Sequence, residues 1–280
     1  MSQPLRDTKE RKFMTEQRLR EAFGKQHKAF IGFVTAGDPT FDKSVASILA
    51  LDAGGADVVE VGIPFSDPVA DGPVIQDADL RAFAAGITTT KVFELVEEVR
   101  RKSDVSLVLL VYLNNIFKYG YDRFFSKCKQ VGIDGVIIPD LPMEERGEVL
   151  PFAHKYQCAL IPLVAPTSAK RIPQIVQGTT GFVYVVSSMG VTGVRSQLDS
   201  NLEDMIAAIR NSTDAPIAVG FGIHTPEQAA KIAAIADGVI VGSAIVKIIA
   251  QNTAETSKKI TEYTRKMSKA IYKINREKSL

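Results

Sequence analysis

Short apolar runs alternate with amphipathic segments along most of the chain, starting at Ala29. The apolar runs place valine, isoleucine and leucine at consecutive positions, without the in–out alternation of a strand that has one solvated face. Continuous runs of this kind are typical of parallel strands that are covered on both sides. We expect eight strands, at Phe30–Thr35, Asp57–Ile63, Leu107–Tyr112, Gly135–Pro139, Ala159–Val164, Phe182–Ser187, Ile217–Gly220 and Gly238–Val241.

A segment with the hydrophobic spacing of a helix follows each expected strand. Strands that alternate with helices over short connections predict right-handed βαβ units. Eight such units within about 220 residues predict an α/β protein with a single, closed (β/α)8 barrel, the TIM barrel. The expected helices are Lys43–Ala53, Thr90–Lys102, Tyr121–Val131, Glu144–Tyr156, Ala169–Gln177, Leu202–Asn211, Glu227–Ala236 and Ser243–Ala250.

An open, doubly wound sheet is the alternative arrangement of the same units. Such a sheet should carry a glycine-rich, dinucleotide-binding turn after its first strand. The turn here reads Thr35-Ala36-Gly37-Asp38-Pro39, which lacks that pattern. The barrel is therefore the favoured fold.

Two segments lie outside the expected barrel. Leu19, Ala22 and Phe23 give Met14–Gly24 an apolar face, which predicts a short extra N-terminal helix that could close the bottom of the barrel. The lysine-rich C-terminal tail is helix-prone, and a solvated amphipathic helix is favoured over a basic binding patch. We expect one domain over residues 1–280, with an N-terminal extension and helix (1–26), the barrel (29–250) and a helical tail (251–280).

Charge and composition narrow the possible functions. The formal net charge is +2, from 34 basic and 32 acidic residues, which gives no support for binding to nucleic acid or to a membrane surface. Cys128 and Cys158 do not form a CxxC pair, as expected in a reducing compartment. No apolar run reaches the ~18 residues of a membrane helix, and the polar start at Met1–Lys12 lacks the apolar core of a secretory signal. These features predict a cytoplasmic protein.

Two carboxylates have unusual surroundings in the segment from Val59 to Pro73. Glu60 lies inside an apolar strand, where a charge is costly unless it is paired, protonated or used in chemistry. Asp71 ends the loop that follows this strand. One carboxylate on a rigid strand and another on a loop suit acid–base chemistry on a small substrate. We therefore expect Glu60 and Asp71 to be catalytic, although a lone glutamate of this kind is more often structural.

Glycines cluster after the sixth, seventh and eighth expected strands, at the end of a barrel where functional residues gather. Glycine lets backbone N–H groups approach an oxyanion, and a Gly-Ser step that opens a helix places the positive end of the helix dipole there. No P-loop or dinucleotide motif competes for this role. We expect the backbone of Gly193, Gly222, Gly242 and Ser243 to hold a phosphate. The loop 190–200 has the composition of a lid, in which Thr192 could reach Asp71.

Other kinds of active site find no support in the sequence. The histidines His27, His154 and His224 are too scattered for a zinc site, and we expect no metal. No GxSxG motif accompanies a His-Asp pair. Acid–base chemistry by carboxylates is the class that remains.

Five segments together resemble the alpha subunit of tryptophan synthase. The first, EVGIPFSDPVADGPVIQ after the second strand, is highly specific, whereas related phosphate-binding barrels share the glycines of the last two segments. The resemblance covers about residues 29–249 of the chain. The other segments are RAFAAG from Arg81, SSMGVTG from Ser187, VGFGI from Val219 and VGSAIVKII from Val241.

The resemblance implies a carbon–carbon lyase that cleaves indole-3-glycerol phosphate to indole and glyceraldehyde 3-phosphate in a retro-aldol reaction. The residues that match the catalytic pair of the family are Glu60 and Asp71. Glu60 would exchange the protons, and Asp71 would accept a hydrogen bond from the indole N–H. The resemblance further places Phe33, Tyr112 and Tyr184 around the indole, and Phe221 beside the phosphate.

The resemblance also implies a partner, a beta subunit that carries pyridoxal phosphate, receives the indole through a tunnel and forms an α2β2 complex. Asp67, Asp140 and Pro142 match surfaces that face this partner, and the chain itself shows no lysine motif for the cofactor. Three alternatives stay open: a stand-alone lyase that releases indole, another phosphate-sugar isomerase, epimerase or synthase with this barrel, and a catalytically silent barrel that acts only as an allosteric partner.

Overall fold

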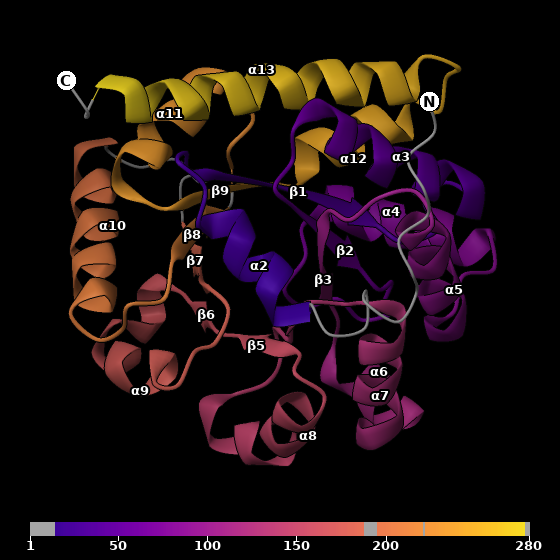
Figure 1. Ribbon diagram of the computed structural model, residues 1–280, viewed down its shortest axis with the longest axis horizontal. Coiled ribbons are helices and arrows are strands. Elements are labelled where there is room, and N and C mark those ends of the chain that lie inside the picture. The colour runs from indigo at the N-terminus through magenta and orange to yellow at the C-terminus, as the bar shows by residue number, and fades with distance from the viewer. Residues whose placement is uncertain (1–14, 188–194, 221, 278–280) are drawn as a thin grey trace.

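The computed structural model describes residues 15–187, 195–220 and 222–277. Within these residues, parallel strands form one sheet in the order β5-β4-β3-β2-β1-β9-β8-β7-β6, with helices arranged around it (Figure 1). The strands are β1 (Ala29–Thr35), β2 (Val58–Gly62), β3 (Ser106–Leu110), β4 (Gly135–Ile137), β5 (Ala159–Ile161), β6 (Leu163–Val164), β7 (Val183–Val186), β8 (Ile217–Gly220) and β9 (Gly238–Val241).

β5 and β6 are the two halves of the fifth expected strand, and together they close the barrel. Pro162 stands between them and has no N–H to donate to a strand ladder. The first half pairs with β4 and the second half pairs with β7. The backbone N–H of Tyr184 on β7 donates to the carbonyl of Pro162 over 2.9 Å. All eight expected strands are therefore present, and the predicted (β/α)8 barrel is confirmed.

The helices that follow the strands include two that the sequence pattern did not predict, α4 and α6. In α4, Ala78 and Ala82 are buried, whereas Leu80 and Phe83 are 66% and 41% exposed. Apolar residues on both faces hide the helical period. The helices are α3 (Phe41–Gly54), α4 (Pro73–Ala84), α5 (Thr89–Arg100), α6 (Leu113–Tyr119), α7 (Tyr121–Val131), α8 (Leu150–Lys155), α9 (Ile172–Val176), α10 (Arg195–Arg210), α11 (Pro226–Ile235) and α12 (Ser243–Ala250).

The expectation of continuous helices at 144–156 and 169–177 is wrong, because each region divides into a 3-10 helix and a short α-helix. A 3-10 helix at Met143–Glu148 precedes α8, and a second at Pro166–Arg171 precedes α9. Pro151 and Pro173 lie in the first turns of α8 and α9. Proline is favoured at the start of a helix and cannot donate to the turn before it, so each proline begins a new helix.

The N-terminal helix α2 (Thr15–Phe23) packs against the bottom of the barrel. Leu19 and Ala22 are 2% and 3% exposed, and they share a core cluster with strand residues such as Ile31 and Val108. In Figure 1, α2 lies across the ring of strands. The helix thus closes the end of the barrel opposite the expected active site, as the sequence pattern predicts.

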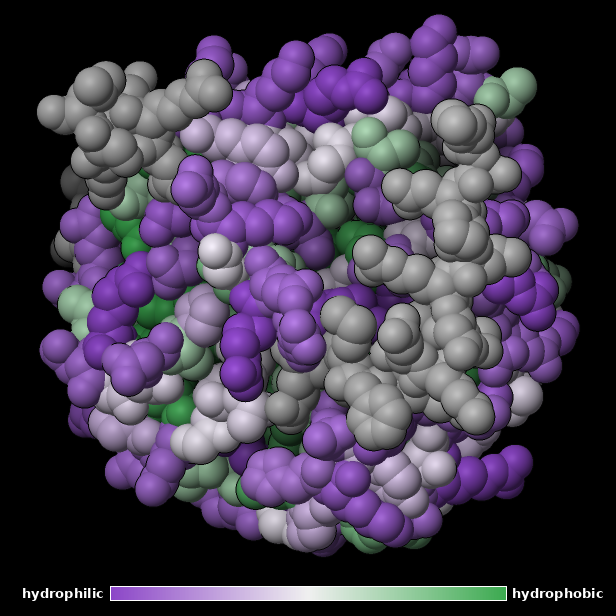
Figure 2. Space-filling view, viewed as in Figure 1, coloured by the Kyte–Doolittle hydropathy of each residue, from purple (hydrophilic) through white to green (hydrophobic). Residues whose placement is uncertain are grey.

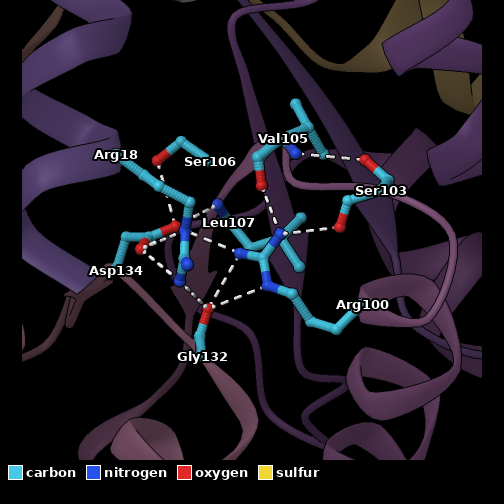
Figure 3. Close-up of polar contacts among 8 residues, drawn as sticks. All are labelled: Arg18, Arg100, Ser103, Val105, Ser106, Leu107, Gly132 and Asp134. Atoms are coloured by element: carbon cyan, nitrogen blue, oxygen red, sulfur yellow. Dashed lines mark hydrogen bonds and ion pairs between the residues drawn. The ribbon is translucent and has the colours of Figure 1, made fainter. Parts of the chain in front are cut away.

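A buried charge network fixes α2 to this end of the barrel (Figure 3). The carboxylate of Asp134 is fully buried between two guanidinium groups, at 2.8 Å from Nη2 of Arg18 and 3.1 Å from Nη2 of Arg100. Both arginines also donate to the carbonyl of Gly132. A buried carboxylate with two cationic partners and several donors is well compensated, whereas the loss of one partner leaves an uncompensated charge.

The same end of the barrel repeats one local arrangement three times. In each case an aspartate lies directly before one strand and accepts a hydrogen bond from the backbone N–H of the first or second residue of a neighbouring strand. This contact satisfies a donor at the end of the strand ladder. The pairs are Asp57 with Phe30 at 2.9 Å, Asp134 with Leu107 at 2.8 Å and Asp237 with Ile217 at 3.0 Å. These carboxylates are structural, and they lie at the opposite end of the strands from Asp71.

The C-terminal helix α13 (Thr256–Glu277) packs along α3 and α11. Ile260, Met267 and Ile271 are fully buried on its inner face. Figure 2 shows hydrophilic residues along the edge of the molecule where α13 lies in Figure 1. The predicted amphipathic tail is confirmed. None of the helices in the described part of the chain is long and apolar enough to cross a membrane.

Candidate active site

Glu60 points into the barrel from the middle of β2. Val58, two residues earlier on the same face of the strand, belongs to the interior core cluster, as does Val108, which pairs with Glu60 across the ladder. The side chain of Glu60 is 1% exposed, and its Oε2 has no hydrogen-bond partner among the described residues. Burial, and secondarily the charge of Asp71, raises the pKa of Glu60 from 4.5 to about 8. Glu60 therefore carries a proton at neutral pH and can give it up there.

Asp71 stands in the loop between β2 and α4, in contact with Tyr112, which lies two residues after the end of β3. The hydroxyl of Tyr112 donates to Oδ2 of Asp71 over 2.8 Å, and it accepts the backbone N–H of Ala70 over 3.0 Å. Burial raises the pKa of Asp71, and the hydrogen bond from Tyr112 opposes that rise. This hydrogen bond favours the anionic form of Asp71 beside the protonated Glu60. The two carboxylates thus have the different environments that acid–base assignments require.

The ring of Tyr112 is itself held in place. Phe65, from the same loop as Asp71, stacks on it with ring centroids 4.7 Å apart and an interplanar angle of 18°. Burial and the neighbouring Asp71 raise the pKa of the Tyr112 phenol, so its hydroxyl remains a proton donor. Tyr112, which follows β3, is therefore joined to the loop after β2 by one aromatic contact and two hydrogen bonds.

Tyr184 faces the carboxylates from β7, on the other side of the barrel. Its side chain is 7% exposed, and burial followed by the charges of Glu60 and Asp71 raises the pKa of its phenol. Gly220 leaves room for this ring, because a Cβ at that position would lie 2.7 Å from the Tyr184 hydroxyl oxygen. Glu60, Asp71, Tyr112 and Tyr184 are thus brought together by the fold.

Phe33 provides an apolar wall next to this group. It pairs with Glu60 in the ladder between β1 and β2 and is 6% exposed. A Cβ on Gly62 would lie 2.7 Å from the ring of Phe33, so this glycine permits the close approach. A flat, apolar molecule would find aromatic surfaces here beside two carboxylates.

The expected phosphate cradle is described only in part. Gly222 is exposed and has a φ of 75°, which a residue with a side chain rarely adopts. Gly242 is the N-cap of α12 and offers no side chain to its first N–H groups, while Ser243, the first helical residue, is exposed. The start of α12 is therefore suited to an anion. Thr192, Gly193 and Phe221 lie outside the described residues.

One buried carboxylate near the site, Asp79 on α4, was not expected. It is 6% exposed, and burial together with the charge of Asp71 raises its pKa from 3.8 to about 7. Two residues further along α4, Arg81 donates to both carboxylate oxygens of Asp38, at 2.7 and 2.9 Å. Recognition of α4 as a helix would have placed Asp79 beside Ala78 and Ala82 on the buried face.

The residues expected at a partner surface lie in the loops at the same end of the barrel. Asp67, Asp140 and Pro142 are exposed, and Oδ1 of Asp140 accepts the N–H of Leu113 at the start of α6 over 2.8 Å. Two exposed apolar side chains lie on the same elements, Val69 at 87% in the loop after β2 and Phe117 at 67% on α6. The expectation that a partner covers this surface stays a prediction.

Comparison with known proteins gives one consistent family. A family model described as tryptophan synthase alpha chain matches residues 19–273. The tryptophan synthase alpha chain of Lacticaseibacillus casei is 51% identical over 258 residues, which cover 92% of this chain and 97% of that one. The tryptophan synthase alpha chain of Caldanaerobacter subterraneus subsp. tengcongensis is 50% identical over 238 residues, which cover 84% of this chain and 91% of that one.

Solved structures of similar proteins share the fold over nearly the whole chain. The tryptophan synthase subunit alpha of Legionella pneumophila is 36% identical with a TM-score of 0.83, covering 92% of this chain and 97% of that one. A chain of tryptophan synthase from M. tuberculosis, in its aminoacrylate-bound form, is 31% identical with a TM-score of 0.81, covering 91% of this chain and 99% of that one. By sequence, coverage and fold, this chain belongs to the tryptophan synthase alpha chain family.

Proposed function

We propose that this chain cleaves indole-3-glycerol phosphate to indole and glyceraldehyde 3-phosphate, with Glu60 and Asp71 as the catalytic residues. The observation that carries the proposal is the burial of Glu60 inside the barrel, which raises its pKa to about 8, close to Asp71, which accepts a hydrogen bond from Tyr112. Family membership supports the substrate class, and the different surroundings of the two carboxylates support the roles that we propose.

Cleavage requires two proton movements around one carbon–carbon bond. A proton added to indole C3 makes the ring electron-deficient, so that the ring can take the electrons of the bond to the glyceryl carbon. Removal of the proton from the hydroxyl on that carbon turns it into the aldehyde. Glu60 can perform both steps, because its pKa of about 8 lets it donate near neutral pH and take a proton back afterwards. No net proton is consumed, and the carboxyl returns to its starting state.

Asp71 acts on the charge that develops during this step. As an anion it accepts a hydrogen bond from the indole N–H and stabilises the positive charge on the ring. The 2.8 Å hydrogen bond from Tyr112 fixes one of its oxygens and leaves the other for the substrate. Phe33 and Tyr184 would contact the indole ring, since both lie in the barrel interior beside the carboxylates.

The phosphate of the substrate would bind at the backbone of Gly222, Gly242 and Ser243, joined by Gly193 and Phe221. The open N-terminus of α12 and the positive φ of Gly222 support this assignment. Thr192 would support Asp71 if the loop after β7 closed over the substrate.

The partner that we propose is a beta subunit with pyridoxal phosphate, in an α2β2 complex that receives the indole and forms tryptophan. The name tryptophan synthase, carried by the relatives, supports it, as do two exposed side chains: Val69, in the loop of Asp67, and Phe117, on the helix whose start contacts Asp140. A partner that contacts this loop could change the rate at Asp71, because Val69 and Asp71 share the loop.

Indole release tests both the reaction and the partner. The purified chain is incubated with indole-3-glycerol phosphate, with and without an added beta subunit, and indole is measured. We expect slow release that rises strongly with the beta subunit. Fast indole release at the same rate with and without the beta subunit would instead support a stand-alone lyase. Absence of indole in both reactions, with phosphate binding intact, would refute the proposed reaction.

A further inference from the structure

Asp79 lies next to the proposed site but has no part in the reaction described above. It occupies the buried face of α4 and is 6% exposed. A carboxylate is rarely buried to this degree without a function for its charge or its hydrogen bonds. Its contacts lead to Asp71.

A short series of contacts connects the two aspartates. The carboxylate of Asp79 accepts a hydrogen bond from the backbone N–H of Phe65. The ring of Phe65 stacks on Tyr112, and the hydroxyl of Tyr112 donates to Asp71 over 2.8 Å. Asp79 therefore holds one end of the loop after β2, and Tyr112 holds the other end.

Among the described residues, the charged groups that act on the carboxyl of Asp79 are acidic. Asp71, from the loop after β2, and Asp38, from the loop after β1, are the acidic groups that act on it. Arg81, on the same helix, directs its guanidinium fork to Asp38. Lys247 of α12, the helix that packs against α4, has an exposed side chain. As a result the pKa of Asp79 is about 7, and its charge changes within the range where the enzyme would work.

We propose that Asp79 is a positioning residue for Asp71: its carboxylate fixes the backbone of Phe65 and thereby the aromatic contact that presents Tyr112, and with it Asp71, to the substrate. This positioning role depends on the proposed reaction in one respect, namely that Asp71 acts on the substrate. The contact series itself exists whatever the substrate is.

The ionisation of Asp79 should give the proposed positioning role a measurable pH dependence. An ionised carboxylate accepts a shorter and stronger hydrogen bond from an N–H group than a neutral acid does. The loop is therefore held more firmly once Asp79 loses its proton, and kcat/KM rises with pH through its pKa of about 7. An asparagine presents a neutral acceptor at every pH, so the same rise is absent from Asp79→Asn.

Three variants separate positioning from a general effect on the fold. At pH 7.5, Asp79→Ala should lower kcat by about 10-fold or more with little change in KM, and Asp79→Asn should stay within about 3-fold of wild type. Between pH 6 and pH 7.5, kcat/KM should rise roughly 2-fold in the wild type, since a neutral acceptor keeps about a third of the activity, and should remain nearly flat in Asp79→Asn. Asp77→Asn removes an equal charge from an exposed position of α4 and should match the wild type.

A measurement without substrate tests the contact directly. In protein with 15N-labelled phenylalanine, the amide signal of Phe65, assigned with Phe65→Leu, should shift with a midpoint near pH 7 in the wild type and not in Asp79→Asn. In Asp71→Asn that midpoint should fall, because a negative charge next to Asp79 is removed.

The outcomes distinguish this proposal from the proposed reaction. A Phe65 signal that does not titrate, or wild-type kinetics in Asp79→Ala, would overturn the positioning role while indole release remains. A Phe65 signal that titrates as expected, in a protein that releases no indole, would uphold the contact and refute the reaction. If Asp79→Ala does not fold, the pH profile and the Phe65 signal of Asp79→Asn still decide.

Discussion

Replacement of Glu60 by glutamine should raise the stability of the folded protein, relative to the wild type, more at high pH than at low pH. Glu60 is buried, and its pKa lies at about 8 instead of 4.5. In the unfolded chain the carboxyl ionises near its ordinary value. Between these two values the native protein holds a proton that the unfolded protein has lost, so the stability of the wild type falls as the pH rises.

The size of this effect follows from the pKa of about 8. One pKa unit corresponds to about 1.4 kcal/mol, so proton linkage at Glu60 lowers the free energy of unfolding by about 1 kcal/mol at pH 5 and by about 4 kcal/mol at pH 8. Glutamine does not ionise, and the burial of its amide costs the same at both pH values. The stability difference between Glu60→Gln and the wild type should therefore be about 3 kcal/mol larger at pH 8 than at pH 5.

Urea unfolding at the two pH values provides the measurement, with the free energy of unfolding extrapolated to water. Glu94→Gln, a change at an exposed glutamate of α5, serves as the control and should show no such pH dependence. A stability difference for Glu60→Gln that is equal at pH 5 and pH 8 would show that Glu60 is ionised in the native protein. The proposed proton donor would then have no proton at neutral pH.

Three further changes test other parts of the structure. Tyr112→Phe removes the hydrogen-bond donor to Asp71 and should lower kcat by about 10-fold or more, with the calorimetric affinity for glycerol phosphate unchanged. Weaker binding of glycerol phosphate would show that the Tyr112 hydroxyl acts on the phosphate and not only on Asp71. Gly222→Val puts a side chain at a φ of 75° and should weaken binding of glycerol phosphate by about 10-fold or more; unchanged affinity in calorimetry would put the phosphate elsewhere. Arg18→Ala leaves Asp134 with one cation and should lower the free energy of unfolding by about 3 kcal/mol, while indole release per folded molecule is unchanged.

The barrel could be predicted because its strands are apolar throughout and its helices mostly have one apolar face. Glu60 could be found because it is a charged residue inside such a strand, and a strand position fixes the direction of a side chain. The phosphate cradle could be proposed in part, from glycines and a Gly-Ser step at the end where functional residues gather.

Other features depend on contacts between distant segments and leave no local pattern. Asp79 looks like an ordinary polar residue in the sequence, because Leu80 and Phe83 on the exposed face of α4 hide which face is buried. The division of the fifth strand at Pro162 follows from its pairing with β4 on one side and β7 on the other. The Asp134 network joins residues more than a hundred positions apart.

The central claim is that Glu60 carries the protons in the cleavage of indole-3-glycerol phosphate. The most direct test compares single-turnover indole release by the wild type and by Glu60→Gln, with the affinity of each for glycerol phosphate measured alongside. We predict that the variant loses turnover by about three or more orders of magnitude and binds glycerol phosphate as the wild type does. Turnover in Glu60→Gln close to that of the wild type would contradict the account.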